Sequence, residues 1–246
     1  MSRIFITGSS DGLGLLTAKT LIHQGHKVVV HARNEKRGNE ALEKLPGAES
    51  VLTADLSDAE ETKLLASKVN DLGAFDVVIH NAGVYNTSER ELFNVNTLAP
   101  YILTCLIQKP KRLIYLSSGM HKSGHFRQES FNTDINRIIY SDTKLQVVIL
   151  CNSVARKCPD VYANSVNPGW VPTKMGGPGA PDNLEKGYQT QVWLATSNDD
   201  KAKVSGRYFY HMKETHSNPD ADDESVQEKF LAICKEITGI SFPLQH

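Results

Sequence analysis

Short β-branched runs alternate with longer helical segments over most of this chain, and this alternation constrains its fold most strongly. The expected strands are RIFIT, KVVVHA, SVLTA, FDVVIHNA, RLIYLSS and VYANSVNP. The expected helices span residues 13–24, 34–45, 58–71, 89–108 and 137–157. Because parallel strands need a crossover connection that is usually a helix, the alternation predicts an α/β fold with a parallel sheet. The expected strands are near-continuous apolar runs, which indicates that helices cover both faces of the sheet.

Length and composition fit a single domain over residues 1–246. Of the 246 residues, 40% are apolar, which is enough for a sizeable core. No internal repeat or low-complexity linker interrupts the pattern. The Gly/Pro-rich stretch KMGGPGAPDN, residues 174–183, is too short for a domain linker. We expect a flexible flap over a binding site near residues 174–190.

Charge, cysteine spacing and hydropathy exclude several classes of protein. The formal net charge of −1 argues against a nucleic-acid partner. The four cysteines form no C-x-x-C pair, which fits a reduced cytoplasmic protein. No signal-peptide pattern is present and no run reaches the about 18 apolar residues of a membrane span, so we expect no membrane anchor. His121 and His125 lack the Glu of a zinc motif between them, so we expect both on the surface and no metal site.

A glycine-rich turn, TGSSDGLG, follows the first expected strand and opens the first expected helix. Glycines let the backbone approach a bulky anion, and the N–H groups at a helix start bind a pyrophosphate. In this position the turn predicts a Rossmann-like, doubly wound sheet of about seven strands that binds a dinucleotide. The candidate contacts in the turn are Gly8, Ser10, Gly12, Leu13 and Gly14. A turn without a ligand is the alternative.

The end of the second expected strand indicates which dinucleotide binds. An acidic residue about 20 positions after the turn suits the ribose 2′-hydroxyl of NAD, whereas an Arg suits the 2′-phosphate of NADP. The segment HARNEKRG places Arg33 here and has no acid at positions 31 to 34. We therefore expect NADP(H) to be preferred and NAD(H) to be possible. Glu35 is better explained as a first-turn helix residue, and a surface Arg33 without a ligand is the alternative.

Polar residues also follow the third and fourth expected strands. Asp55 and Leu56 lie in TADLS, and Asn81, Ala82 and Gly83 lie in HNAG. Ligands of doubly wound sheets bind outside the carboxyl ends of the strands. We expect the Asp55 side chain to bond the adenine edge and the backbone at 81–83 to approach the adenosine ribose. Helix capping is the alternative role for both polar side chains.

The segment YSDTK places a phenol and an ammonium on one face of a helix. Tyr140 and Lys144 are four residues apart, so their side chains project toward the same spot. The apolar run LQVVIL follows them and is expected to be buried. The pair therefore either lies at a solvated helix end or points toward a ligand.

Four motifs in order carry a family resemblance: TGSSDGLG, HNAG, YSDTK and NPGWVPT. The chain resembles the short-chain dehydrogenase/reductases over nearly its whole length. It is most similar to their retinol-dehydrogenase and carbonyl-reductase-like group, through FNVNTLAPY, RLIYLSSGMHKSGHF and SGRYFYHMKE. The resemblance implies an NAD(P)-dependent oxidoreductase that interconverts a small-molecule carbonyl and an alcohol.

The resemblance also implies roles for individual residues. The implied catalytic residues are Asn96, Ser118, Tyr140 and Lys144, with Ser117 as the other candidate for the serine. The implied contacts with the nicotinamide half of the cofactor are Pro168, Gly169, Val171 and Thr173. The family uses the Asn to hold a helix kink and a water, whereas a buried Asn often only satisfies backbone groups.

Carbonyl reduction needs a hydride on carbon and a proton on oxygen, and Tyr140 would give the proton. The pKa of an ordinary phenol is about 10. A neighbouring ammonium favours phenolate, so we expect Lys144 to lower the pKa of Tyr140. Ser118 would bond the substrate oxygen, and Lys144 would also bond the ribose of the nicotinamide half.

Two segments are shorter than is usual in the family, from Asn81 to Asn96 and from Asn96 to Ser118. In many relatives these helices build a dimer face, so we expect a monomer or a homodimer and a wider substrate mouth. Retinoid specificity is not carried over.

The expected substrate walls are 84–92, 120–130 and 174–190. Their apolar candidates are Tyr85, Met120, Phe126, Trp170 and Met175.

The sequence favours an NADP(H)-dependent reductase of ketones or aldehydes that is reversible as an alcohol dehydrogenase. A dinucleotide-binding sensor or scaffold without turnover is the alternative from another class. The complete set of Ser118, Tyr140 and Lys144 argues against it, because such a protein needs only the glycine turn. A sugar-nucleotide epimerase or dehydratase is disfavoured by the spacing of the glycines and by the lack of a large C-terminal substrate domain.

Overall fold

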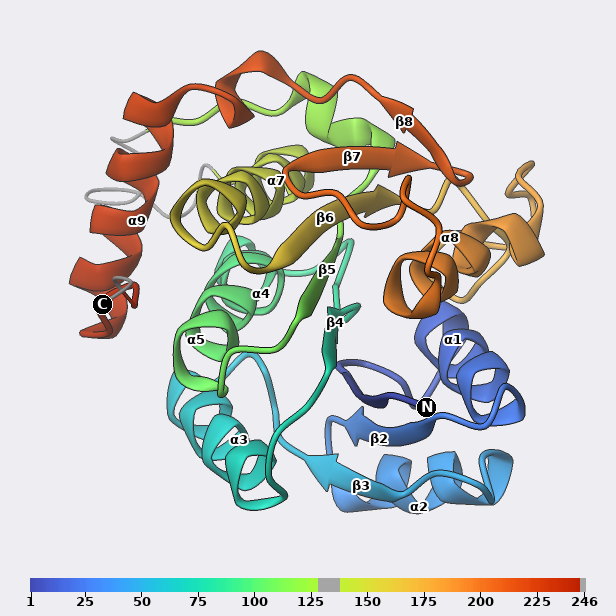
Figure 1. The fold of residues 1–246 in the computed structure, drawn as a ribbon. Coiled ribbons are helices and arrows are strands. Elements are labelled where there is room, and N and C mark those ends of the chain that lie inside the picture. The colour runs from blue at the N-terminus through green and yellow to red at the C-terminus, as the bar shows by residue number, and fades with distance from the viewer. Residues whose placement is uncertain (128–137, 244–246) are drawn as a thin grey trace.

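Eight strands form one sheet in the computed structural model, which describes residues 1–127 and 138–243 (Figure 1). The strands are β1 (Arg3–Ile6), β2 (Lys27–Ala32), β3 (Ser50–Thr53), β4 (Val77–His80), β5 (Arg112–Leu116), β6 (Tyr162–Asn167), β7 (Arg207–Tyr210) and β8 (Lys213–Thr215). Their order is β3-β2-β1-β4-β5-β6-β7-β8, and β8 alone pairs antiparallel within this part of the chain. The strand order reverses between β1 and β4, which is where doubly wound sheets bind ligands.

The helices form a layer on each face of the sheet (Figure 1). They are α1 (Gly12–His23), α2 (Glu35–Lys44), α3 (Ala59–Asp71), α4 (Glu89–Phe93), α5 (Ala99–Leu106), α7 (Tyr140–Lys157), α8 (Leu184–Thr196) and α9 (Glu224–Thr238). Shorter helical turns are η1 (Asn94–Leu98), η2 (Gly119–Ser123) and η4 (Pro219–Ala221). One layer contains α1, α2 and α8, and the other contains α3, α4, α5, α7 and α9. The doubly wound α/β sheet predicted from the alternation is confirmed.

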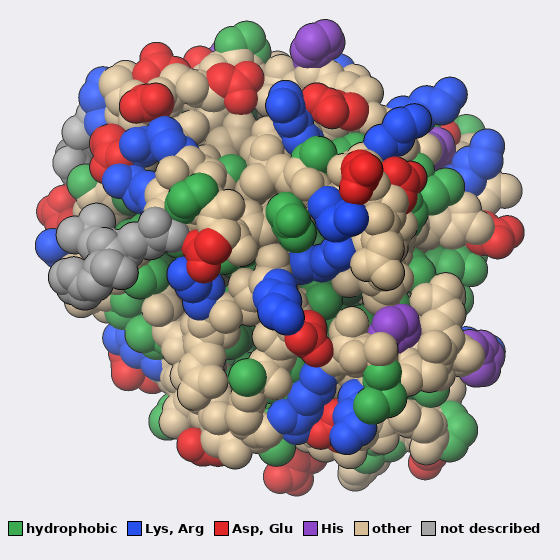
Figure 2. Space-filling model, viewed as in Figure 1, with side chains coloured by type: hydrophobic (Ala, Val, Ile, Leu, Met, Phe, Trp, Pro, Cys, Tyr) green, Lys and Arg blue, Asp and Glu red, His purple; other side chains and the backbone are tan. Residues whose placement is uncertain are grey.

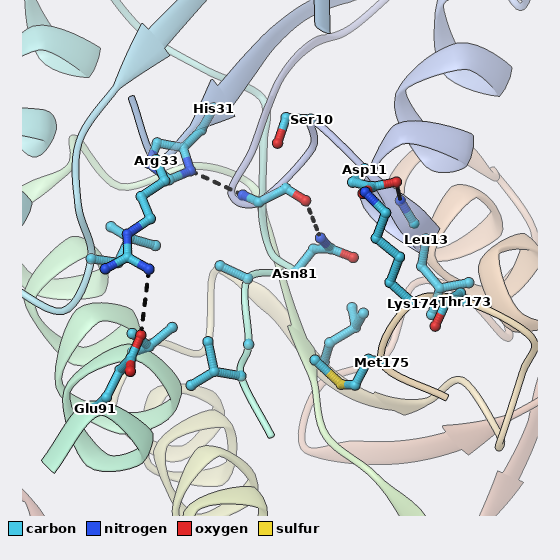
Figure 3. A pocket seen from close by; sticks show the side chains of 18 of the residues that line it. Ser10, Asp11, Leu13, His31, Arg33, Asn81, Glu91, Thr173, Lys174 and Met175 are labelled. Carbon is cyan, nitrogen blue, oxygen red and sulfur yellow. Dashed lines mark hydrogen bonds and ion pairs between the residues drawn. The ribbon is translucent and has the colours of Figure 1, made fainter. Parts of the chain in front are cut away.

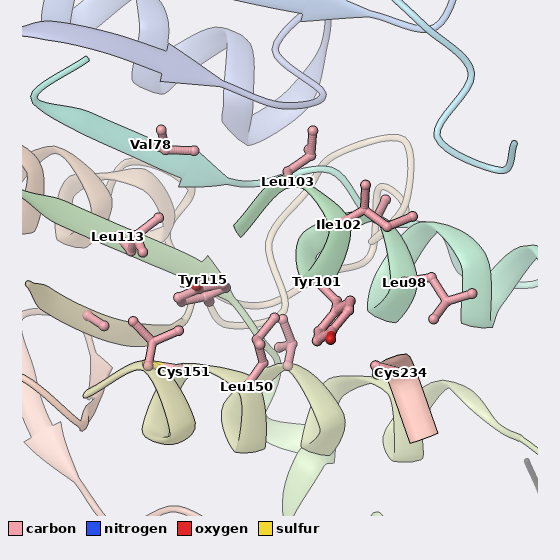
Figure 4. Close-up of a cluster of buried hydrophobic side chains, with 14 of the residues drawn as sticks. Val78, Leu98, Tyr101, Ile102, Leu103, Leu113, Tyr115, Leu150, Cys151 and Cys234 are labelled. Atoms are coloured by element: carbon pink, nitrogen blue, oxygen red, sulfur yellow. The ribbon is translucent and has the colours of Figure 1, made fainter. Parts of the chain in front are cut away.

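Successive strand residues enter opposite cores, as the pleat requires. Phe5 packs in the core beneath α5, α7 and α9, whereas Ile4 and Ile6 pack in the core beneath α1 and α8. In the first core, Tyr101 and Tyr115 are fully buried among side chains of α5 and α7 (Figure 4). Both faces of the strands are thus covered, which explains their near-continuous apolar sequence.

The helix expected over 89–108 is not one α-helix. The chain forms α4, then a π-helical turn over Asn94–Leu98, then α5. At the centre of this turn, the buried Asn96 accepts a hydrogen bond from Val84 N (2.8 Å) and donates to Val84 O (3.0 Å) and Thr143 Oγ1 (3.1 Å). The π turn thus aims the amide at the loop after β4 and at α7. Such turns are rare and often occur at functional sites.

Helix α7 is expected over 137–157 and begins at Tyr140, while residue 137 lies outside the described residues. The Asp142 carboxylate accepts hydrogen bonds from Ile139 N (3.4 Å) and His125 N (2.9 Å), which helps to fix the start of the helix. Every residue from Ser141 to Val154 is buried. The first turn of α7 is therefore held inside the molecule at the level of the strand ends.

Acidic and basic side chains are interspersed on the face of the molecule that Figure 2 shows. This distribution agrees with the net charge of −1. No helix in the described ranges is both long and apolar enough to span a membrane.

Replacing Asn96 by Ala should destabilise the fold, because the N–H and C=O of Val84 would lose their partner inside the protein. We expect the free energy of unfolding to fall by about 2 kcal/mol, the usual cost of unsatisfied buried groups. Urea denaturation measures the change. The exposed Asn39 on α2 provides the control, because Asn39→Ala removes an asparagine that is not buried. Equal effects of the two substitutions would contradict the assigned bonds.

Candidate active site

A cavity of about 510 Å³ lies along the carboxyl ends of the strands, at the reversal of strand order (Figure 3). Most of the residues predicted to contact a cofactor line it. They are Gly8, Ser10, Gly12, Leu13, Arg33, Asp55, Leu56, Asn81, Ala82, Gly83, Tyr140, Lys144, Pro168 and Thr173. Gly14, Gly169 and Val171 do not line the cavity, and neither do Asn96 and Ser118.

The glycine turn requires glycines for steric reasons that the structure makes explicit. Gly8 has φ +61°, and a Cβ there would lie 2.8 Å from Ala82 Cα. A Cβ on Gly14 would overlap the Asn81 side chain and Gly8 O, so this glycine serves the packing of α1 rather than the cavity. Gly12 also has a left-handed φ of +55°. The turn leaves backbone open to the cavity at the start of α1, which fits a pyrophosphate.

The loops after β1 and β4 are bonded directly to each other. Thr7 Oγ1 accepts hydrogen bonds from the N–H groups of Asn81 and Ala82, both at 3.0 Å. The Asn81 amide donates to Thr7 O and Gly8 O, both at 3.0 Å. Asn81 therefore links two loops through its side chain and does not cap a helix. Asn81 still lines the cavity together with Ala82 and Gly83, so the backbone of this segment is available to a ligand.

His31 is a site residue that the sequence did not single out. Its Nδ1 accepts a hydrogen bond from Gly8 N (3.0 Å), and its Nε2 lies 3.1 Å from Ala54 O. Burial lowers the pKa of His31 to about 4, so the ring is neutral at pH 7. A neutral ring with these partners carries its proton on Nε2. His31 therefore connects the ends of β1, β2 and β3 without contributing charge.

Arg33 faces the cavity and is paired with two acids. Its Nε and one terminal nitrogen lie 2.8 Å from Asp55 Oδ2, and its other terminal nitrogen lies 3.5 Å from Glu91 Oε1 (Figure 3). Arg37, which the sequence did not single out, reaches the same cavity from α2. Its Nε lies 3.5 Å from Ser10 Oγ. Two guanidinium groups therefore stand at the end of β2.

Asp55 is bonded within the protein rather than held open toward an adenine. Its Oδ1 accepts hydrogen bonds from Ser57 N (3.0 Å) and Ser57 Oγ (2.7 Å), and its Oδ2 is paired with Arg33. Burial raises the pKa of Asp55, but the bonds from Ser57 and Arg33 outweigh it and hold the pKa below its usual value. The capping alternative does not apply, because Asp58 caps α3.

The two candidate serines point in different directions. Ser117 is buried, and its hydroxyl donates to Lys144 O (2.8 Å). Ser118 caps the turn η2 by accepting a hydrogen bond from Met120 N (3.2 Å), and its hydroxyl is close enough to Tyr140 to act on the pKa of the phenol. This orientation favours Ser118 over Ser117 as the partner of the phenol.

Tyr140 and Lys144 lie together at the bottom of the cavity, and both are perturbed by burial. Burial raises the pKa of Tyr140 to about 12, although the bond from Ser118 works in the opposite direction. Burial lowers the pKa of Lys144 to about 8. Lys144 Nζ donates to Leu116 O (3.0 Å) and lies 5.5 Å from the centroid of the Tyr140 ring. The expected lowering of the Tyr140 pKa by the ammonium is therefore wrong for the protein alone, because desolvation of the phenol dominates.

Some residues of the segment after β6 face the cavity, and others pack inside the protein. Pro168 and Thr173 face the cavity. Gly169 has φ +84° and its N–H donates to Asn167 Oδ1 (2.9 Å), while Val171 is buried against Gly187. Residues 174–183 form an irregular loop, but residues 184–190 are the start of α8 and not part of an irregular flap.

The expected surface position of His121 is wrong. His121 is fully buried, because it bonds Ser118 O (2.7 Å) and Asn218 N (3.1 Å) and packs against Tyr208. The wall candidate Phe126 is half-buried and packs against Phe230 at the edge of the core. Within residues 1–127 and 138–243, no cluster of His, Cys, Asp and Glu could hold a metal ion.

The other wall candidates are exposed. Tyr85 meets Tyr140 edge to face with ring centroids 4.8 Å apart. Met120, Trp170 and Met175 are also exposed, and Met175 lines the cavity. Residues 128–130 of the predicted wall 120–130 lie outside the described residues.

Comparison with known proteins identifies the family. A family model described as short chain dehydrogenase matches residues 2–109. The short-chain dehydrogenase chyC of Penicillium rubens is 39% identical over 99% of this chain and 100% of its own length. The chain belongs to the short-chain dehydrogenase/reductase family. An uncharacterized oxidoreductase of Emericella nidulans is 46% identical over 99% of both chains. This short-chain dehydrogenase/reductase is therefore an NAD(P)-dependent enzyme.

Solved structures share the fold of this short-chain dehydrogenase/reductase. An uncharacterized protein from Mycobacterium paratuberculosis superposes with a TM-score of 0.84 and 22% identity, covering 99% of this chain and 96% of its own. A blue fluorescent protein from a metagenomic library, solved in complex with NADPH, superposes with a TM-score of 0.70 and 19% identity, covering 85% and 95%.

Replacing Gly8 by Ala should both destabilise the fold and weaken dinucleotide binding. The added Cβ would meet the Ala82 backbone, whereas a Cβ on Gly25, which shares a left-handed φ, would meet nothing within 4 Å. Gly25→Ala therefore serves as the control for backbone strain alone, which costs about 1–2 kcal/mol. Urea denaturation and NADPH titration should show a larger loss for Gly8→Ala in both measurements. Matched losses would contradict the close approach.

Proposed function

We propose that this enzyme reduces a ketone or an aldehyde to an alcohol with NADP(H), reversibly, and that Tyr140 donates the proton. The observation that carries the proposal is the pair of Tyr140 and Lys144 in the cavity that the glycine turn lines, with Ser118 near the phenol. The sequence motifs that led to these residues support it. The substrate is a small carbonyl or alcohol molecule.

Each residue has a part in the proposed reaction. A bound nicotinamide supplies or accepts the hydride. The Tyr140 hydroxyl keeps its proton at pH 7, since burial raises its pKa to about 12, so the group is ready to donate to a carbonyl oxygen. The Ser118 hydroxyl, beside that of Tyr140, donates a hydrogen bond to the same oxygen and stabilises the charge that develops there. Oxidation requires the phenolate, so this direction should accelerate as pH rises.

Lys144 and Asn96 support this geometry. Lys144 is buried and still mostly protonated at pH 7, because its pKa of about 8 lies above that pH. A Cβ on Gly83 would lie 3.1 Å from Lys144 Nζ, so the missing side chain keeps space beside the ammonium. That space suits the ribose hydroxyls of the nicotinamide half. Asn96 holds the loop after β4 against α7 and is proposed as a positioning residue.

The preference for NADP(H) rests on the side chains at the end of β2. Arg33 and Arg37 both line the cavity there, and Ser10 lies beside Arg37. The nearby acid Asp55 is already paired with Arg33 and bonded to Ser57, so it is not free to accept from a ribose 2′-hydroxyl. The NADPH complex of the structural neighbour agrees with this preference.

The proposal places the protein in the cytoplasm as a monomer or homodimer. All four cysteines, Cys105, Cys151, Cys158 and Cys234, are free thiols, which agrees with a reducing compartment.

Tyr140→Phe should abolish carbonyl reduction while leaving the affinity for NADPH nearly unchanged, because it removes the proton and keeps the ring. We expect kcat to fall by about a thousandfold, which lies within the range that a positioned general acid contributes. The control is Tyr85→Phe, which keeps the ring that meets Tyr140. Turnover with a panel of aldehydes and ketones measures the effect. Full turnover by Tyr140→Phe would refute the assignment, and NADPH binding by the wild type without turnover on any substrate would favour a sensor.

Arg33→Ala and Arg37→Ala should each reduce kcat/KM with NADPH and spare kcat/KM with NADH. Arg33→Ala should have the larger effect, about tenfold or 1.4 kcal/mol, because it also leaves Asp55 and Glu91 facing the 2′-phosphate without a cation. Lys36→Ala, at an exposed position of the same helix as Arg37, controls for the lost charge. An unchanged cofactor preference in both arginine variants would remove them from the 2′-phosphate.

A further inference from the structure

The Asp11 carboxylate, which lines the cavity, pairs with one cation from the loop after β6 and with another from α2. Lys174 Nζ lies 2.6 Å from Asp11 Oδ2 (Figure 3). Arg37 lies 3.3 Å from the same oxygen. Lys174 belongs to the loop after β6, Arg37 to α2, and Asp11 to the glycine turn. The Lys174 side chain is 81% exposed, so burial does not hold it in this place.

The position of Asp11 is unusual for a phosphate site. Asp11 caps α1, and its Oδ1 accepts a hydrogen bond from Gly12 N (2.8 Å). The start of a helix favours anions, which is why the pyrophosphate is expected here. A carboxylate at the same end would repel the phosphates. Two cations beside one carboxylate give a local charge of +1, so the three groups together attract the phosphates.

Hydrogen bonds tie the loop that carries Lys174 to the residues that precede it. Residues 174–183 are called the flap from here on. Gly177 N donates to Thr173 O (2.8 Å), and Trp170 Nε1 donates to Gly176 O (2.7 Å). At the far end of the flap, Trp170 N donates to Asp182 Oδ2 (2.6 Å). The flap is therefore anchored beside Trp170 and Thr173, and the ion pair of Lys174 with Asp11 adds a contact with the glycine turn.

We propose that Asp11 is a positioning residue that presents Lys174 and Arg37 to the phosphates of the cofactor, and that the Lys174–Asp11 ion pair holds the flap closed over the pyrophosphate. This inference rests on the proposed function, since it assumes a nicotinamide dinucleotide in the cavity. The two cations serve different phosphates. Arg37 lies beside Ser10 at the adenosine end, whereas Lys174 follows Thr173, which lines the cavity near the glycine turn.

The test compares dissociation rates of NADPH and NADH, measured by stopped-flow fluorescence. The variants are Lys174→Met, Asp11→Asn and the double variant. Asn also caps helices, so Asp11→Asn keeps α1 intact. Lys174→Met should release both coenzymes about fivefold faster, as expected for an ion pair near the surface, and to the same extent because the pyrophosphate is common to both. The double variant should release the coenzymes no faster than Lys174→Met does. Lys186→Met, which removes an exposed lysine at the start of α8, should change neither rate.

A second readout separates the closed flap from a simple loss of charge. Hydrogen exchange of residues 174–183 should slow when NADPH binds to the wild type and should not slow in Lys174→Met. The difference in coenzyme release rate between the wild type and Lys174→Met should also shrink at about 0.5 M salt, where the screening length falls to a few ångströms.

The outcomes distinguish this inference from the proposed function. If the wild type binds both coenzymes and Lys174→Met releases them at the wild-type rate, the inference fails and the proposed function stands. An effect confined to NADPH, or additive effects of Lys174→Met and Asp11→Asn, would also overturn it. If the wild type binds neither coenzyme, the proposed function fails and the inference falls with it.

Discussion

The site depends on a close contact between two loops at the carboxyl ends of neighbouring strands. Thr7 and Asn81 exchange hydrogen bonds across β1 and β4, and Gly8 comes so close to Ala82 that a side chain has no room. His31 extends the same network to β2 and β3 with a neutral ring. This contact brings the glycine turn and the loop before α4 side by side along one cavity. Every proposed cofactor contact is placed relative to it.

A second constraint is the desolvation of two ionisable groups. Lys144 is buried and Tyr140 is half-buried in the first two turns of α7. Burial favours the neutral form of each, which raises the pKa of the phenol and lowers that of the ammonium. The pair therefore holds a proton on the phenol in the protein alone. In the proposed reaction, substrate and cofactor enter this environment, and the Ser118 hydroxyl already lies beside the phenol.

The sequence predicted the fold well because its signals are local. Strand and helix periodicity, the glycine turn and the ordered motifs all depend on residues close in the chain. Arg37 and Lys174 were missed because their importance arises from tertiary contact with Asp11, which spacing does not encode. The burial of His121 was missed for the same reason, since its partner Asn218 lies in another loop. The expected pKa of Tyr140 was wrong because a neighbouring charge is visible in sequence and desolvation is not.

The central claim is that a buried phenol at position 140 keeps its proton until a carbonyl accepts it. The direct measurement is a pH titration of the protein labelled with ¹³C at tyrosine Cζ, in which the Tyr140 resonance is the one that Tyr140→Phe removes. The account predicts that this resonance stays at the phenol position up to at least about pH 10, the ordinary value for a phenol. Ionisation of this tyrosine at about pH 8 or below in the protein alone would contradict it.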